Sequence, residues 1–108
     1  MKSIFEKYLG QEVEIVVDRP LGSKHPKFDM VYPINYGYVP GTKAPDGEEI
    51  DAYILGVIKP VEKFAGRVIA IIHRLNDDDD KLVVASVGEN FSDEQIKELT
   101  NFQERYFK

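Results

Sequence analysis

The stretch RVIAIIHRLNDDDDKLVVASV, residues 67–87, carries the strongest strand signal of the sequence. Residues 67–75 are an apolar run with almost no polar interruption, and residues 81–87 form a second apolar run rich in valine. Runs of β-branched residues favour strands, and the acidic segment between them has the composition of a turn. The sequence therefore predicts a strand, a tight turn and a returning strand.

Three further segments on the N-terminal side have strand character. Residues 11–20 form a β-branched run that ends in a proline, and residues 48–57 form another strand candidate. Residues 29–41 look extended, but Pro33 and Gly37 interrupt them. Because proline removes a backbone donor and glycine weakens a strand interior, this segment predicts an irregular or edge strand.

Helices are predicted near both ends of the chain. Residues 3–9 lie between a capping-box pattern and a glycine, which predicts a short helix. Ser92 and Gln95 have the spacing of a second capping box, and Phe91 precedes them as a hydrophobic staple. Apolar residues then follow at helical spacing, which predicts a terminal amphipathic helix: Ile96, Leu99, Phe102 and Tyr106.

About five strands and one terminal helix predict a mainly β fold of the α+β class. We expect a small five-stranded OB-like barrel packed by the C-terminal α-helix. Periodicity does not fix the order of the strands. A length of 108 residues fits one domain, residues 1–108, with a core of its own.

Composition excludes several classes of partner. The net charge is −5, which argues against nucleic-acid or anionic-membrane binding by bulk electrostatics. The absence of cysteine excludes disulfides and cysteine-based zinc sites, and it fits a reducing compartment. No segment approaches the roughly 20 apolar residues of a membrane-spanning helix. We therefore expect a soluble cytoplasmic protein without a nucleic-acid or membrane partner.

The segment PDGEEID, residues 45–51, places Asp46, Glu48 and Asp51 around a turn. One interpretation is a solvated hairpin, and the other is an oxygen-ligand site for Mg²⁺, which binds carboxylates and waters. Crowded carboxylates repel one another unless cations compensate them. If the acidic run 77–80 folded close to this segment, the two together would hold more than one metal ion.

Cationic and phenolic side chains are candidates for a phosphate clamp, since they donate hydrogen bonds to phosphate oxygens. The alternative is that each lysine serves solubility and each tyrosine serves packing. The sequence contains no phosphate-cradling glycine loop, no HExxH and no GxSxG motif, so it offers no serine or cysteine nucleophile. The candidates are Arg19, Lys24, Lys27, Lys43, Lys81, Tyr32, Tyr36 and Tyr106.

Two adjacent motifs, YPINYGYVPGT and DGEEIDAYIL, resemble the soluble family I inorganic pyrophosphatases. The signature of that family is Asp, a small or polar residue, Asp, Pro or Glu, an aliphatic residue and Asp. Residues 46–51 match it except at Glu48, where the family has aspartate. The resemblance extends over roughly residues 30–108.

The resemblance implies a metal centre. Asp46 and Asp51 correspond to the first and last acids of the signature, which bind metal in the family. The acidic run is shorter here than in the family, and we take Asp77 and either Asp79 or Asp80 as further ligands, with Asp80 preferred. The implied cofactor is Mg²⁺, two or more ions, with Mn²⁺ as a substitute.

The resemblance also implies roles in catalysis and substrate binding. Glu48 takes the place of the acid that helps to deprotonate the attacking water, and Tyr36 that of the phosphate-binding tyrosine. The family's basic residue ahead of the tyrosines corresponds to Lys24 by direct counting and to Arg19 if a gap is allowed. The implied substrate-binding residues are Arg19, Lys24, Tyr32, Tyr36, Lys81 and Tyr106.

These residues together predict Mg²⁺-dependent hydrolysis of inorganic pyrophosphate to two phosphates by a metal-activated water, which makes the chain an inorganic diphosphatase. The resemblance also implies a homo-oligomer. Two alternatives stay open. One is hydrolysis of another small phosphate ester or a nucleoside polyphosphate. The other is a non-catalytic module of the same fold that binds phosphate or a protein.

Overall fold

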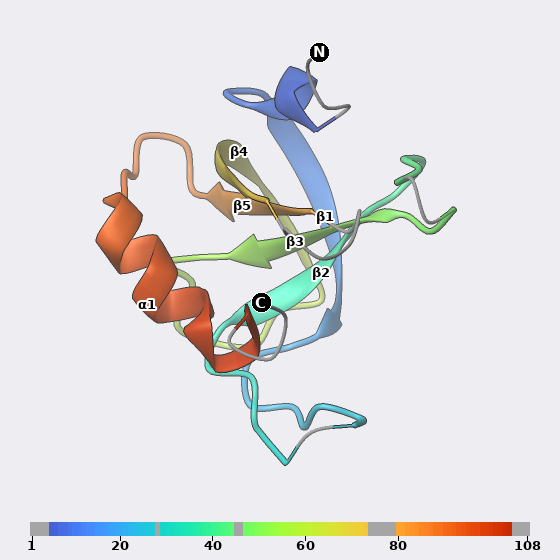
Figure 1. The fold of residues 1–108 in the computed structure, drawn as a ribbon, viewed down its shortest axis with the longest axis vertical. Helices are drawn as coiled ribbons and strands as arrows, with labels where there is room; N and C mark the ends of the chain where they lie inside the picture. Colours follow the sequence, from blue (N-terminus) through green and yellow to red (C-terminus); the bar gives the residue numbers. More distant parts are fainter. Residues whose placement is uncertain (1–4, 28, 45–46, 74–79, 105–108) are drawn as a thin grey trace.

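The computed structural model describes residues 5–27, 29–44, 47–73 and 80–104. Within them, five strands form a closed barrel and one α-helix follows at the C-terminal side (Figure 1). This arrangement confirms the predicted mainly β fold with a terminal helix. The elements are η1 (Glu6–Tyr8), β1 (Glu12–Arg19), β2 (Asn35–Val39), β3 (Ile50–Ile54), β4 (Lys63–Ile72), β5 (Lys81–Ala85) and α1 (Asp93–Glu104).

The strands follow the order β1-β2-β3-β5-β4 around the barrel, and β4 closes it against β1. β4 and β5 pair antiparallel, which confirms the strand and the returning strand predicted within residues 67–87. The turn predicted between them falls mainly on residues 74–79, which lie outside the described residues. β3 and β5 instead run parallel, with Ala52 opposite Leu82. Two strands that are separated by β4 in the sequence therefore begin at the same end of the barrel.

For residues 29–41, which were predicted to form an irregular or edge strand, the edge position is wrong. Within this segment β2 pairs with β1 on one side and with β3 on the other. Gly37 allows β2 to lie close enough to β1 to pair with it, because a Cβ atom at this position would lie 2.0 Å from the carbonyl oxygen of Val16. Pro33 precedes the strand and so removes no donor from its ladder.

The extents of β4 and of the N-terminal helix also differ from the prediction. β4 begins at Lys63, four residues before the predicted start, because its first residues pair with β1, and Lys63 lies opposite Val16. The predicted helix over residues 3–9 is a three-residue 3-10 helix, η1, within the described residues. Its proposed capping residue, Ser3, lies outside them.

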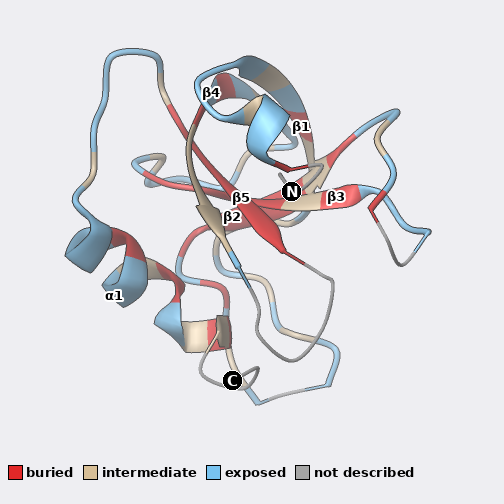
Figure 2. Ribbon diagram, turned by 45° about the horizontal axis from the view of Figure 1, so that its top comes forward, coloured by how far each residue is buried: buried red, intermediate tan, exposed pale blue. Residues whose placement is uncertain are grey.

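Buried side chains form two clusters, one inside the barrel and one on its outer face. Figure 2 colours the ribbon by the burial of each residue. Successive residues of a strand point to opposite faces, so a strand that is buried throughout needs cover on both sides. All five residues of β5 are buried. The outer cover comes from α1, whose Ile96 packs in one cluster with Tyr53 and Val83. The helix thereby reaches the tyrosine-rich face of β2 and β3.

The start of α1 confirms the predicted capping box. The Ser92 backbone N–H donates to Gln95 Oε1 at 2.8 Å, and the Gln95 N–H donates to Ser92 Oγ at 3.1 Å. Phe91 and Leu99 pack against the outer cluster, as a staple and an apolar stripe require. None of the helices in the described part of the chain is long and apolar enough to cross a membrane.

Candidate active site

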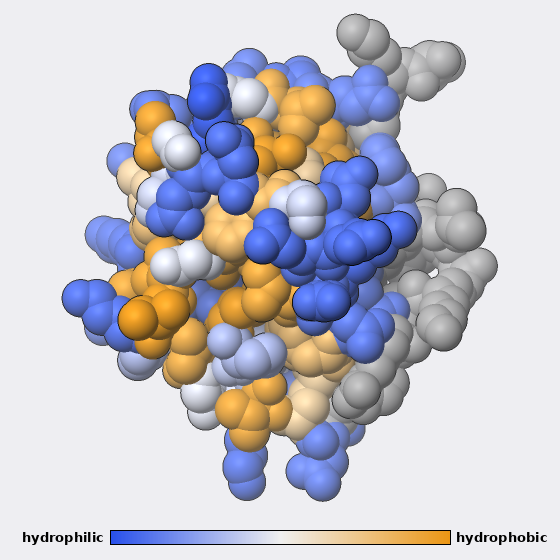
Figure 3. All heavy atoms as spheres, turned by 90° about the vertical axis from the view of Figure 1, so that its left-hand side faces the viewer, coloured by the Kyte–Doolittle hydropathy of each residue, from blue (hydrophilic) through white to orange (hydrophobic). Residues whose placement is uncertain are grey.

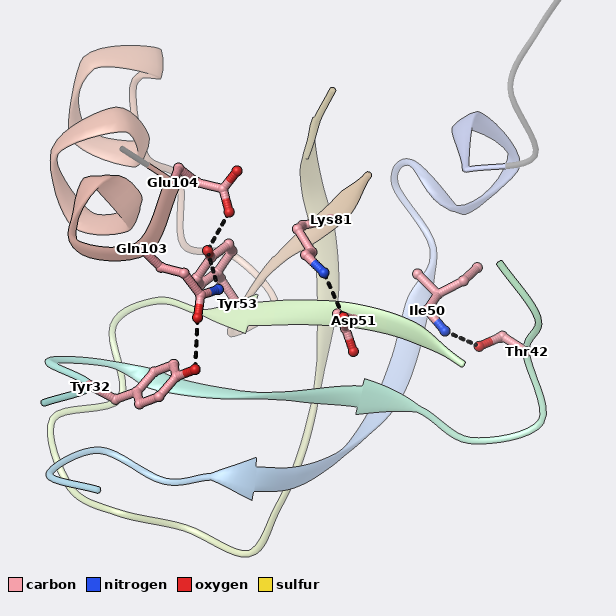
Figure 4. A network of polar contacts seen from close by, with 8 residues as sticks. All are labelled: Tyr32, Thr42, Ile50, Asp51, Tyr53, Lys81, Gln103 and Glu104. Atoms are coloured by element: carbon pink, nitrogen blue, oxygen red, sulfur yellow. Dashed lines mark hydrogen bonds and ion pairs between the residues drawn. The ribbon is translucent and has the colours of Figure 1, made fainter. Parts of the chain in front are cut away.

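The parallel pairing of β3 with β5 places Asp51 beside Lys81 at the start of the two strands. Lys81 Nζ donates to Asp51 Oδ2 at 2.5 Å (Figure 4). The Lys81 side chain is 3% exposed, whereas that of Asp51 is 32% exposed. An ammonium group loses much hydration energy on burial, so it requires a carboxylate partner of this kind. The pair therefore joins a buried cation to a partly solvated anion.

Both acidic segments of the sequence lead into these two strands. Gly47 and Glu48 precede β3, with Glu48 exposed, and Asp80 immediately precedes β5. Because the strands are parallel, Glu48 and Asp80 lie toward the same end of the barrel. Asp80 Oδ2 lies 2.7 Å from Nδ1 of His73, at the end of β4.

Carboxylate oxygens of the described residues are chemically suitable ligands for a divalent metal. Asp51 already holds a cation, the ammonium of Lys81, and carboxylate oxygens are the donors that Mg²⁺ prefers. Among residues 5–27, 29–44, 47–73 and 80–104, no three acids or histidines lie close enough together to form a metal site. Asp46 and Asp77, two of the four predicted ligands, lie outside these ranges.

Tyr36 connects the Asp51–Lys81 pair to a cluster of aromatic rings. Its ring centroid lies 5.8 Å from Lys81 Nζ, 5.6 Å from the ring of Tyr32 and 4.9 Å from that of Tyr53. Tyr36 and Tyr53 are cross-strand partners on β2 and β3. The predicted phosphate-binding tyrosine therefore lies next to the predicted phosphate-binding lysine.

The structure brings Arg19 to this cluster and leaves Lys24 in the loop after β1. Arg19 is the cross-strand partner of Tyr36, at a β-bulge that follows Val17. Lys24 is exposed, and its backbone forms an isolated bridge with Val31. Of the two basic residues between which the sequence left the choice open, Arg19 lies beside the tyrosines. Tyr106 falls outside the described residues.

Burial and charge shift two pKa values in this region. Burial raises the pKa of Tyr32 to about 12, although the charge and a hydrogen bond of Arg19 act in the opposite direction. Desolvation likewise raises the pKa of the Asp18 carboxyl, against the lowering effect of Arg19, and the negative charge of Asp51 adds to the rise. Asp18 and Arg19 therefore belong to the same electrostatic environment as Asp51.

We expect the free energy of unfolding to fall between pH 10 and pH 12. The pKa of the Tyr32 phenol is about 12 in the folded protein and 10.0 ordinarily, so the folded state binds this proton more tightly. The resulting stabilisation is complete below pH 10 and is lost as the pH rises toward 12. Urea unfolding at a series of pH values measures it. The Tyr32→Phe variant should lose less stability over this range, and an equal loss would contradict the assignment.

Sequence reasoning missed three polar residues that hold the site together. Asn35 is fully buried, and its Oδ1 accepts a hydrogen bond from the Leu21 N–H at 2.9 Å, which fixes the loop just after Arg19. Gln103 and Glu104, on α1, hydrogen-bond to tyrosine hydroxyls of the cluster (Figure 4). The sequence contains one indication of the role of Gln103. It lies seven residues after Ile96 and therefore on the apolar face of the helix.

A groove on the surface is lined by none of the predicted site residues, although His73 and Glu104 border it. It has a volume of about 530 Å³ and lies between β4 and α1, where its walls include Ile71, Ile96 and Lys97. Figure 3 shows the α1 side of the molecule, on which apolar and hydrophilic residues alternate. The predicted chemistry is therefore gathered around β2, β3 and β5 and not at this groove.

Comparison with known proteins gives one family. The inorganic pyrophosphatase family model matches residues 7–108. The inorganic pyrophosphatase of Saccharolobus solfataricus is 29% identical over 100 residues, which amount to 91% of this chain and 55% of that protein. The chain thus spans about half the length of this curated relative.

Solved structures show the same barrel. The inorganic pyrophosphatase of Ehrlichia chaffeensis matches with a TM-score of 0.71 and 18% identity over 92% of this chain and 83% of that one. The enzyme of Coxiella burnetii matches with a TM-score of 0.67 and 21% identity over 88% and 76% of the two chains. At these identities the likeness establishes the fold, a five-stranded OB-like barrel with a C-terminal helix.

Proposed function

Since the chain belongs to the inorganic pyrophosphatase family, we propose that it hydrolyses inorganic pyrophosphate to two phosphates with Mg²⁺ as its cofactor. The observation that carries the proposal is the parallel pairing of β3 with β5, which brings Asp51 and Lys81 together beside Tyr36. Carboxylate, ammonium and phenol groups in contact supply both a cation site and donors for phosphate oxygens.

The acids are the proposed metal ligands. Asp46 and Asp51 would hold Mg²⁺ together with Asp77 and Asp80, and Mn²⁺ would serve in its place. When bound, these ions supply an acidified water and neutralise charge on the phosphates. Glu48 would accept the proton of the attacking water. Its exposed position at the turn before β3 leaves its carboxylate open to solvent and substrate.

The basic and phenolic residues are the proposed substrate ligands. Arg19 and Lys81 would pair with phosphate oxygens, and the Tyr36 hydroxyl would donate to them, with Tyr32, Lys24 and Tyr106 around them. Phosphoryl transfer requires little covalent work from the protein, so positioning and charge neutralisation would supply most of the rate. Lys81 is suited to this task because its contact with Asp51 holds the ammonium in place before substrate arrives.

Release of inorganic phosphate from pyrophosphate tests the proposal directly. We expect turnover in millimolar Mg²⁺, loss of turnover with excess EDTA, and recovery when Mg²⁺ or Mn²⁺ is restored. Parallel assays with nucleoside triphosphates and sugar phosphates should give far lower rates. A faster rate on one of those substrates would show that its class, and not pyrophosphate, is the substrate. The absence of any turnover at micromolar protein and saturating Mg²⁺ would leave a non-catalytic module.

The proposal includes a quaternary state and a compartment. The family assignment supports one domain over residues 1–108 that forms a homo-oligomer, and the lack of cysteine fits the cytoplasm. Analytical ultracentrifugation measures the first, and a monomer at micromolar concentration would contradict it.

A further inference from the structure

A chain of hydrogen bonds runs from the tyrosine cluster to the end of α1 (Figure 4). The Tyr32 hydroxyl donates to Gln103 Oε1 at 2.7 Å, and Gln103 Nε2 donates to the Tyr53 hydroxyl at 2.7 Å. The Tyr53 hydroxyl in turn donates to Glu104 Oε2 at 2.5 Å. Each donor thus points toward the carboxylate of Glu104, an order in which successive bonds polarise one another.

Gln103 is the centre of this series of hydrogen bonds, because its side-chain amide accepts from Tyr32 and donates to Tyr53. Gln103 is 4% exposed, and the two tyrosines that it joins, Tyr32 and Tyr53, are 2% and 0% exposed. Burial raises the pKa of Tyr32 to about 12, so its phenol keeps the proton that it donates to Gln103. Burying an amide without hydrogen-bond partners costs free energy. The two bonds therefore hold Gln103 in its bridging position.

The two rings held by Gln103 flank the candidate phosphate-binding residue. The ring of Tyr36 lies 5.6 Å from that of Tyr32 and 4.9 Å from that of Tyr53, measured between centroids. Phe102, the neighbour of Gln103 on α1, packs edge-on against the same two rings, at 5.4 Å and 5.9 Å.

We propose that Gln103 is a positioning residue for Tyr36: by holding the hydroxyls of Tyr32 and Tyr53, it fixes the two rings against which the Tyr36 ring packs. The inference rests on the proposed function for its effect on turnover. Its geometric part, the placement of the Tyr36 ring, is independent of that function. α1 thereby acts on the phosphate site although its side chains do not form that site.

The test is a double-mutant cycle between Gln103 and Tyr36. We expect Gln103→Met to lower kcat/KM for pyrophosphate about tenfold, because a less ordered Tyr36 ring must be ordered on binding. In the Tyr36→Phe background the same substitution should change kcat/KM by less than about twofold, since the hydroxyl to be positioned is gone. An undiminished tenfold loss in that background would overturn the proposal.

Thr100→Val is the matched control, because Thr100 is buried on the same helix and its hydroxyl bonds only within it, to the Ile96 carbonyl at 2.8 Å. It removes a buried hydroxyl without touching the tyrosine chain. We expect it to lower the melting temperature and to leave kcat/KM within about twofold of the wild type. An equal loss of kcat/KM in both variants would show that helix stability alone explains the effect, and it would overturn the proposal.

A readout without turnover separates this inference from the proposed function. The ring protons of Tyr36, assigned with Tyr36→Phe in tyrosine-labelled protein, should shift in Gln103→Met and stay unchanged in Thr100→Val. If Gln103→Met does not fold, Tyr53→Phe serves, since it keeps the ring and removes the hydroxyl that bonds to both Gln103 and Glu104. Unshifted Tyr36 protons in a folded variant would overturn the inference. Shifted protons in a protein without pyrophosphatase activity would overturn only the proposed function.

Discussion

The Asp51→Asn variant is expected to hydrolyse pyrophosphate at least about a thousandfold more slowly than the wild type. The substitution removes the charge of a proposed metal ligand and weakens the contact that holds Lys81. Both losses act on the stabilisation of charge in the transition state, which supplies most of the rate in phosphoryl transfer. Initial rates of phosphate release over a range of Mg²⁺ concentrations measure the effect, and excess Mg²⁺ should not restore the rate.

Glu49→Gln is the matched control, since it removes the same charge two residues away. Glu49 is exposed, and its Oε2 accepts from the Gly41 N–H at 3.3 Å. We expect this variant to retain its rate within about threefold, in line with an exposed group outside the site. Thermal unfolding first confirms that both variants are folded, because loss of one partner of a buried ion pair destabilises a protein. A folded Asp51→Asn variant that keeps a tenth of the wild-type rate would refute the metal assignment.

We expect Gly37→Ala to cause a large loss in the free energy of unfolding. The added Cβ atom would lie 2.0 Å from the carbonyl oxygen of Val16 and 2.8 Å from the Val17 Cα, both of them backbone atoms. Because backbone in a paired strand cannot move aside cheaply, β1 and β2 must separate at the bulge. We expect a cost of more than about 3 kcal/mol, and hence a melting temperature lower by more than about 12 °C.

Gly41→Ala separates this steric effect from the general cost of replacing glycine. Gly41 has a φ of +79°, and a Cβ atom there would meet nothing within 4 Å. Its substitution should therefore cost about 1–2 kcal/mol through backbone conformation alone. Differential scanning calorimetry of both variants measures the difference. Equal losses for the two variants would show that the contact between β1 and β2 is not tight at Gly37.

Local pattern predicted the strands and the terminal helix, because β-branched runs and the capping box act over a few residues. It did not predict the parallel pairing of β3 with β5, because no property of either strand specifies a partner thirty residues away. The mistake over β2 has the same origin. Gly37 weakens an isolated strand, yet in the barrel it permits the approach of Val16, a residue twenty-one positions earlier.

The candidate site was predicted in part for a similar reason. Asp51, Tyr36 and Lys81 belong to sequence motifs, and the structure brings these three together. Gln103 was not among the predicted residues, since its role depends on two tyrosines of other elements. A polar residue on the buried face of a helix is the one feature of the sequence that pointed to such a role.

The order of the strands has a consequence for the kinetics of folding. β1 closes the barrel against β4 through pairs such as Glu12 with Arg67, fifty-five positions apart, and β3 pairs with β5 although the whole of β4 lies between them in the sequence. Such distant pairs slow folding, to the range of milliseconds to seconds for barrels of this kind. The contact of Asp51 with Lys81 belongs to one of these distant pairings. A nascent or partly folded chain therefore lacks the contact at the proposed catalytic centre, and activity should appear in refolding no earlier than closure of the barrel.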